Sequence, residues 1–163
     1  MAVRITSRLE PGDVARRLGT GRMVVAASPD YLDRHGEPQH PSELIHHQCL
    51  GYTATANGQR WGFIIDGKME MFPIRSRLQT NNGDVLVKAA AAGLGITYEP
   101  MFSAGDLLES GALRKILTTF STPELGIHAV LPGNRHIPHR LRVLMDFLVE
   151  QLGDKDSPAA RRQ

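Results

Sequence analysis

The chain has 163 residues, of which 41% are hydrophobic and 22% are charged, a composition that suits one domain or two small lobes. Its 19 basic and 17 acidic residues leave a net charge of +2, which does not by itself indicate nucleic-acid binding. The single cysteine excludes an internal disulfide, and no apolar run approaches the roughly 18 residues of a membrane span. These features predict a soluble, cytoplasmic protein.

The N-terminal part of the sequence predicts two strands and a short helix. Residues 1–5 have strand character, and Pro-Gly and Gly-Thr-Gly breaks separate them from the nearly all-apolar run 23–28. Such a run predicts burial on both faces, as in a parallel sheet. Ser28 followed by Pro29 is a helix-start signal, and Gly36 is expected to end the helix.

The middle of the chain has antiparallel character. A short helical turn is expected near residues 41–47, and strands are expected at 48–53, 60–65 and 68–76. The dipeptide Asp66-Gly67 between the last two strands is a strong hairpin signal. Pro73 favours an edge or a bulge for its strand.

Helices and strands alternate in the last part, which favours an α/β fold. The stretch "QTNNGDVLVKAAAAGLGI" (79–96) predicts a helix, and an amphipathic helix is expected at 138–152. The apolar stripe of the second helix consists of Leu141, Leu144, Met145, Leu148, Val149 and Leu152. Between these helices we expect a strand at 95–100, a helix at 101–110, and strands at 112–117 and 126–132. The polar residues 153–163 are expected to be disordered.

The glycines of the stretch 79–96 suggest a phosphate-binding loop, but neither GxxxxGK[ST] nor GxGxxG occurs there. The GLG segment follows the helix, at the negative end of its dipole, so Gly93 is better interpreted as a C-terminal cap. Thr80, Asn81 and Asn82 precede the helix. They either cap it only, or cap it and leave N–H groups for a ligand carboxylate or carbonyl. Asp84 would repel a strongly charged anion.

No residue set predicts an enzyme or a metal protein. His46 and Cys49 have metal-ligand spacing but no further ligands. No GxSxG elbow is present, and Ser28 is explained by capping. Trp61 and its aromatic neighbours lack interleaved basic residues, so they indicate a sheet core rather than a base-stacking surface. We therefore expect no catalytic residues, no metal and no cofactor.

Several motifs occur in an order that resembles the effector-binding (substrate-binding) domain of LysR-type transcriptional regulators. They are "ASPDYL", the proline-spaced "HPSEL" with "HQCL" after it, the Asn-Gly-Asp helix ending in "AGLGI", and "LPGNRHIPHRLRVLMDFL". The resemblance covers residues 2 to 152. It implies an α/β fold of two lobes like that of type 2 periplasmic binding proteins, joined by crossover strands.

The resemblance also implies a division of the chain. Residues 1–22 would end the first lobe, and 23–132 would form the second lobe with its crossover strands. Residues 133–152 would form a helix that returns to the first lobe, and 153–163 the tail. The winged helix-turn-helix and most of the first lobe of the family precede the part that this sequence resembles.

The function implied is binding of a small metabolite in the cleft between the lobes, coupled to transcription control in the full-length protein. That protein would be a homo-oligomer, a dimer or tetramer, that contacts promoter DNA only through its N-terminal domain. A stand-alone solute-binding module of the same fold is the alternative. The effector-binding residues carried over from the family are Thr6, Ser7, Thr80, Asn81, Asn82, Gly83, Tyr98, Glu99 and Pro100.

Overall fold

The structure is a computed structural model that describes residues 1–6, 9, 14–53, 59–131 and 138–152. It contains two compact units, Met1–Arg22 with Glu124–Gln163, and Met23–Pro123. Strand β2 (Val14–Ala27) contributes to both units because their boundary falls within it. Helices and strands alternate along the chain, so the predicted α/β class is confirmed.

The first unit is an antiparallel sheet with one helix. Its strands lie in the order β1, β9 and β2, where β1 is Ala2–Thr6 and β9 is Glu124–Leu131. Helix α4 (His139–Leu152) buries Met145 among Leu18, Ala129 and Leu131. An ion pair of 2.6 Å between Arg16 Nη1 and Asp146 Oδ1 joins the strand and the helix at the rim of this cluster.

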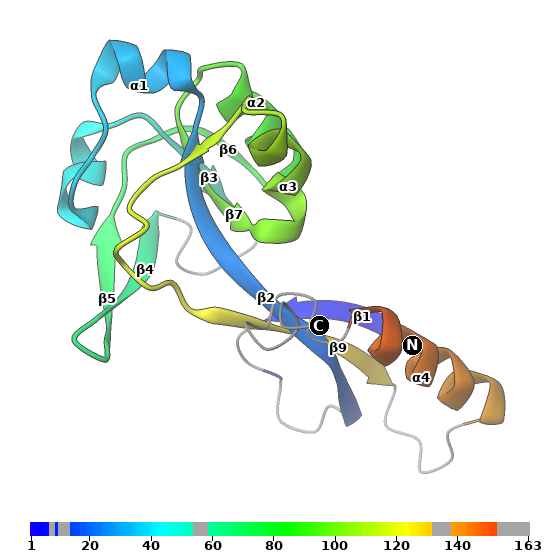
Figure 1. Cartoon of the computed structure of the whole chain (residues 1–163). Coiled ribbons are helices and arrows are strands. Elements are labelled where there is room, and N and C mark those ends of the chain that lie inside the picture. The colour runs from blue at the N-terminus through cyan, green and yellow to red at the C-terminus, as the bar shows by residue number, and fades with distance from the viewer. Residues whose placement is uncertain (7–8, 10–13, 54–58, 132–137, 153–163) are drawn as a thin grey trace, which may run out of the picture. The chain divides into compact units, whose positions relative to one another are not determined.

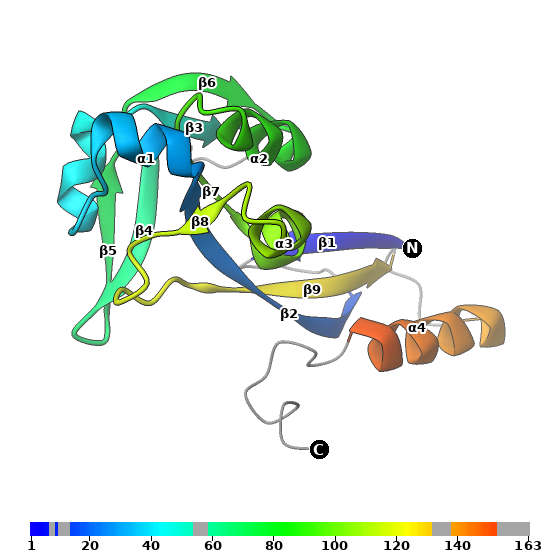
Figure 2. The same ribbon diagram turned by 45° about the horizontal axis from the view of Figure 1, so that its top comes forward.

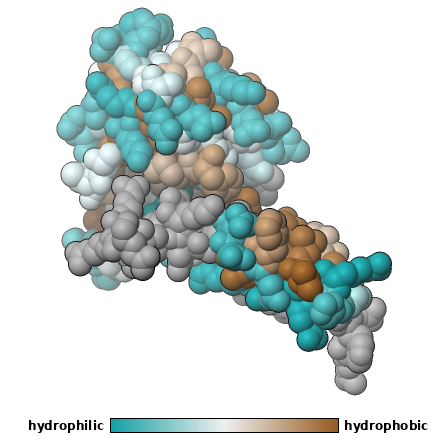
Figure 3. Space-filling view, turned by 45° about the vertical axis from the view of Figure 1, so that its right-hand side comes forward, coloured by the Kyte–Doolittle hydropathy of each residue, from teal (hydrophilic) through white to brown (hydrophobic). Residues whose placement is uncertain are grey.

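Part of the apolar surface of the first unit stays exposed. Val3 and Ile5 lie opposite Ala129 and Ile127 in the sheet, so they share the face on which α4 packs, yet they are 51% and 45% exposed. On α4 itself Phe147 is 55% exposed. Figure 3 shows hydrophobic side chains on the surface of this unit beside hydrophilic ones.

The second unit contains α1 Pro29–His35, a 3-10 helix Pro41–His46, β3 Cys49–Tyr52, β4 Arg60–Ile65, β5 Lys68–Pro73, β6 Ser76–Thr80, α2 Gly83–Ala91, β7 Ile96–Pro100, α3 Met101–Glu109 and β8 Arg114–Lys115. The main strands of its sheet lie in the order β2, β7, β3, β6. Strands β6 and β7 run parallel to β3, whereas β2 is antiparallel to β7, and the short β8 also pairs with β2. A separate hairpin consists of β4 and β5.

Two hydrophobic clusters lie on opposite faces of this sheet. Along β2, Val24 and Ala26 belong to the cluster under α2 and α3, while Val25 and Ala27 belong to the cluster with α1 and the β4–β5 hairpin. Figures 1 and 2 show α2 and α3 together on one side of the sheet and α1 on the other. Any side chain of the central strands therefore faces one cluster or the other.

The local signals around the two predicted helices are confirmed. The Ser28 hydroxyl accepts a hydrogen bond from Tyr31 N, and Pro29 is the first residue of α1. Gly93 has φ +79°, and the bonds from Gly93 N to Ala90 O and from Leu94 N to Ala89 O close the end of α2. Gly93 thus ends the helix, as its position predicted.

Four sequence expectations are wrong. The strand expected at 48–53 in an antiparallel section is β3, which pairs parallel with β6 and β7. The predicted break before residue 23 is absent, because β2 begins at Val14 and continues through Gly19. Its pairing register with β9 shifts between Arg17 and Gly19. The run 23–28 is buried on both faces, but in an antiparallel pairing with β7, since helices cover both faces of this sheet. Leu144 of the predicted stripe is 41% exposed, because only one side of α4 meets the sheet. The expected disordered tail lies outside the described residues.

Strand β6 was not anticipated, since its alternating pattern in "SRLQT" is short and half-exposed. Among the described residues, no helix is both long enough and apolar enough to cross a bilayer.

Candidate functional site

The carboxyl ends of three parallel strands meet at one edge of the second unit. At this edge Tyr52 of β3 lies opposite Thr80 of β6, and Thr53 N donates to Thr80 O at 2.9 Å. The chain then enters α2 at Gly83 and returns along β7. In open α/β sheets, ligands bind outside the carboxyl ends of the strands, next to such helix starts. The edge is therefore the candidate site.

Two side chains hold the start of α2. Asn82 Oδ1 accepts from Asp84 N at 3.0 Å and from Val85 N at 3.4 Å, and Thr80 Oγ1 accepts from Asn82 N at 3.2 Å. These bonds leave the Gly83 N–H as a first-turn donor that no described residue accepts. The partial positive charge of the helix start makes this N–H a site for a ligand acceptor.

Glu99 brings a carboxyl group to the same place. It lies on the face of β7 under α2 and α3, opposite Val24, and is only 4% exposed. A β-carbon at residue 83 would lie 2.6 Å from Glu99 Oε2, so the absence of a side chain at Gly83 is what admits the carboxyl group. Glu99 Oε1 is buried and has no hydrogen-bond partner among the described residues.

Burial governs the charge state of Glu99. Loss of water around the carboxyl group, together with the negative charge of Asp84, raises the pKa of Glu99 to about 7. The group therefore changes between its neutral and charged forms near neutral pH. Thr97, two residues earlier on the same face, also has a buried Oγ1 without a partner among the described residues.

The other predicted residues of this strand lie elsewhere. Tyr98 points to the opposite face, where its ring stacks on Trp61 at 5.3 Å and its hydroxyl donates to Gly62 O at 2.7 Å. Burial raises the pKa of Tyr98 far above its ordinary value. Pro100 ends β7 opposite Met23 and precedes α3. The structure thus brings Glu99, but not Tyr98, to the start of α2.

Three predicted residues remain, and two of them belong to the N-terminal segment. Thr6 is the last residue of β1, opposite Gly126. Ser7 lies outside the described residues. Asn81 is exposed in the turn between β6 and α2.

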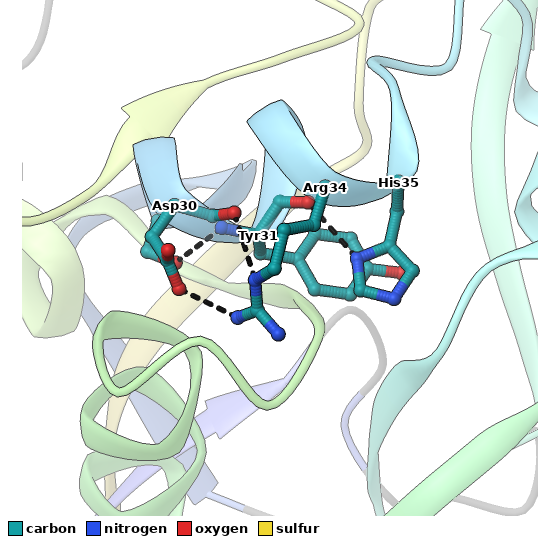
Figure 4. A network of polar contacts seen from close by, with 5 residues as sticks. Asp30, Tyr31, Arg34 and His35 are labelled. Atoms are coloured by element: carbon teal, nitrogen blue, oxygen red, sulfur yellow. Dashed lines mark hydrogen bonds and ion pairs between the residues drawn. The ribbon is translucent and has the colours of Figure 1, made fainter.

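A histidine-rich cluster surrounds Tyr31 and was missed by the sequence reasoning. The Tyr31 hydroxyl accepts from Gln48 N at 2.9 Å and lies 3.2 Å from His47 Nδ1. The His35 ring stacks on Tyr31 at 4.3 Å, and Figure 4 shows it beside the Asp30–Arg34 pair on α1. Burial lowers the pKa of His47. These contacts join α1 to the segment before β3, which is a structural role.

The metal and thiol alternatives have no supporting geometry in the described part of the chain. There, no three His, Cys, Asp or Glu side chains gather in a way that could hold a metal ion. Burial raises the pKa of Cys49 to about 12, and its Sγ contacts Leu44 O at 3.5 Å. A neutral, enclosed thiol of this kind is not a nucleophile.

Comparison with known proteins assigns the chain to a family. Residues 1–153 match the family described as the LysR substrate binding domain. The chain belongs to this family. It is 38% identical over 138 residues to an HTH-type transcriptional regulator of Haemophilus influenzae, covering 85% of this chain and 48% of the relative. It is also 32% identical over 155 residues to the HTH-type transcriptional regulator CrgA of Neisseria meningitidis, covering 94% and 52% of the two chains.

Solved structures of LysR-type regulators share the fold. The CrgA regulatory domain matches with a TM-score of 0.79 at 32% identity, covering 93% of this chain and 74% of that one. The full-length virulence activator AphB of Vibrio cholerae matches with a TM-score of 0.76 at 28% identity, covering 91% and 50%. The LysR-type chain therefore spans about half the length of the curated relatives it matches.

Proposed function

We propose that this LysR-family chain is the effector-binding region of a transcriptional regulator and that it binds a small metabolite at the start of α2. The observation that carries the proposal is the unused Gly83 N–H beside the buried, unpartnered carboxyl group of Glu99, at the carboxyl edge of the parallel strands. Both groups are polar and need a partner that the described residues do not supply. A small ligand would satisfy them together.

The site is built for binding rather than catalysis. The side-chain oxygens of Thr80 and Asn82 accept hydrogen bonds from backbone N–H groups at the helix start. Neither residue is therefore placed as a nucleophile with a base beside it. We propose that the protein is not an enzyme and that Thr80, Asn81, Asn82, Gly83 and Glu99 form the effector contacts in the second unit. Thr6, Ser7, Tyr98 and Pro100 remain predictions from the family resemblance.

In the full-length regulator, we propose that effector binding changes the affinity of a DNA-binding domain for promoter DNA. A coupling free energy of about 1–3 kcal/mol suffices for a several-fold to hundredfold change. We further propose a homo-oligomer located in the cytoplasm, with residues 1–22 ending the first lobe, 23–132 forming the second lobe and 133–152 forming the returning helix.

A ligand screen with matched variants tests the proposal. The chain is titrated with a library of small metabolites, and binding is followed by thermal shift and by NMR. Thr80→Val removes a hydroxyl group at the candidate site with little change in volume, and Asn81→Ala removes an exposed side chain of the same turn. Thr119→Val, an exposed threonine between β8 and β9, is the matched control. A ligand whose affinity is unchanged in both site variants would show that the site lies elsewhere.

A further inference from the structure

Glu99 is a carboxyl group that the fold itself does not use. Only 4% of the Glu99 surface is exposed, and its Oε1 has no hydrogen-bond partner among the described residues. Leaving such a group without a partner is unfavourable, and native proteins rarely retain one without a reason. Its position against the first residue of α2, which has nine residues, directs it toward the candidate ligand rather than toward a structural partner.

Two groups at the start of α2 require ligand groups of opposite charge. The Gly83 N–H at the positive end of the helix calls for an acceptor, such as a carboxylate. The acidic pair Glu99 and Asp84 calls for a donor that carries positive charge. A dicarboxylate or phosphate would satisfy the first demand and be repelled by the second. A simple amine would do the reverse.

A molecule with an ammonium group next to a carboxylate meets both demands at once. We propose that the effector is a small α-amino acid, with its ammonium group bound by Glu99 and its carboxylate at the first turn of α2. This inference rests on the proposed function, because it names the ligand class of that same site. Thr80 fits the arrangement, since its oxygen accepts from Asn82 N and its hydroxyl hydrogen is available to the ligand carboxylate.

The surroundings of Glu99 make binding depend on pH. On α2 the charged neighbour is Asp84, and Val24 of β2 lies opposite Glu99. The hydrophobic cluster on this face of the sheet also contains Leu50 and Tyr52 of β3 and Ala104 of α3. Among these residues, Asp84 supplies a negative charge that acts on Glu99. Because the pKa of Glu99 is about 7 without ligand, a proton must leave it before it can pair with an ammonium group. Affinity is therefore expected to rise roughly tenfold from pH 6 to pH 8.

The experiment is calorimetric titration of the full chain with a panel of L-amino acids and with their matched carboxylic acids that lack the amino group. At least one amino acid is expected to bind, at least tenfold more tightly than its matched acid, with net proton release measured in buffers of different ionisation enthalpy. Glu99→Gln is expected to weaken binding at least tenfold at pH 8 and to remove the pH dependence. Glu70→Gln, on the exposed face of β5, is the matched control and is expected to change neither.

Other results overturn the inference and can be told apart from failure of the proposed function. Equal binding of the matched acid, or proton uptake instead of release, would mean that Glu99 does not pair with an ammonium group. If no amino acid binds but another metabolite does so with sensitivity to Thr80→Val, the site stands and the ligand class falls. If no compound binds with sensitivity to Thr80→Val or to Asn81→Ala, both proposals fail. Proton release by the unmodified chain keeps the test valid even if Glu99→Gln does not fold.

Discussion

The carboxyl group of Glu99 lies against Gly83, with Oε2 2.6 Å from the point where a β-carbon of residue 83 would stand. The first prediction is that Gly83→Ala destabilises the chain by about 1–3 kcal/mol, the range found when atoms are added to a packed interior. The gain in helix propensity from alanine, about 1 kcal/mol at most, offsets only part of this cost. Urea denaturation measures the change in the free energy of unfolding.

A double-mutant cycle shows whether Glu99 is the cause. In a Glu99→Ala background the carboxyl group is gone, so adding Gly83→Ala is expected to be close to neutral. If the effects of the two substitutions on the free energy of unfolding were additive, contact with Glu99 would not be the cause of the destabilisation by Gly83→Ala.

The second prediction concerns the pH dependence of stability. The pKa of Glu99 is raised from 4.5 to about 7 in the folded chain, so the folded state holds a proton that the unfolded state releases. Stability from this group is therefore fully present below pH 4.5 and is lost as the pH rises through 7. The expected total loss is on the order of 3 kcal/mol, because the pKa rises from 4.5 to about 7 and each pKa unit corresponds to about 1.4 kcal/mol.

Denaturant unfolding at pH 4.5 and pH 8 tests this loss in matched chains. Glu99→Gln cannot ionise, so its stability is expected to fall by about 3 kcal/mol less over this range than that of the unmodified chain. Glu70→Gln on exposed β5 is expected to follow the unmodified chain. Parallel curves for the unmodified chain and Glu99→Gln would show that Glu99 ionises normally.

The start of α2 could be predicted from sequence because its cause is local. Asn82 and Asp84 are separated by a single glycine, so the amide side chain reaches the next N–H groups whatever the rest of the fold does. The end of the helix at Gly93 is local for the same reason. Neither feature depends on how the strands are ordered.

The contact between Gly83 and Glu99 could not be predicted in the same way. It exists because the chain crosses from β6 through α2 to β7 with β3 between the two strands, and no local pattern gives that order. One part of the site was foreseeable, however. Neighbouring residues of a strand face opposite sides, so Tyr98 and Glu99 could not both lie under α2.

The third prediction is that Tyr31→Phe destabilises the second unit by about 1–3 kcal/mol. The Tyr31 hydroxyl accepts from Gln48 N at 2.9 Å, and its loss leaves this N–H without its acceptor. The His47 contact is lost as well. Thermal unfolding measures the effect. The control is Tyr52→Phe at the half-buried last residue of β3, which is expected to lie within about 0.5 kcal/mol of the unmodified chain. An equal effect of both substitutions would contradict a specific role of the Tyr31 hydroxyl.

The fourth prediction separates the two sides of α4. Met145 is 2% exposed among Leu18, Ala129 and Leu131, so Met145→Ala is expected to cost about 2–5 kcal/mol of stability in the first unit. Phe147 is 55% exposed two residues later, and Phe147→Ala is expected to cost less than about 1 kcal/mol. Hydrogen exchange of the β9 amides measures the first unit separately from the second.

Solubility should respond in the opposite way to the two substitutions. Phe147 lies on the exposed side of α4 with Val143 and Leu144, which are 53% and 41% exposed, so replacing it removes apolar surface from contact with water. Phe147→Ala is therefore expected to lower binding of a hydrophobic dye such as ANS and to reduce concentration-dependent light scattering. Met145→Ala is expected to raise both, because it loosens the packing of the helix. If Phe147→Ala reduced the hydrogen-exchange protection of the β9 amides as much as Met145→Ala does, α4 would have to pack on the sheet through the side that carries Phe147.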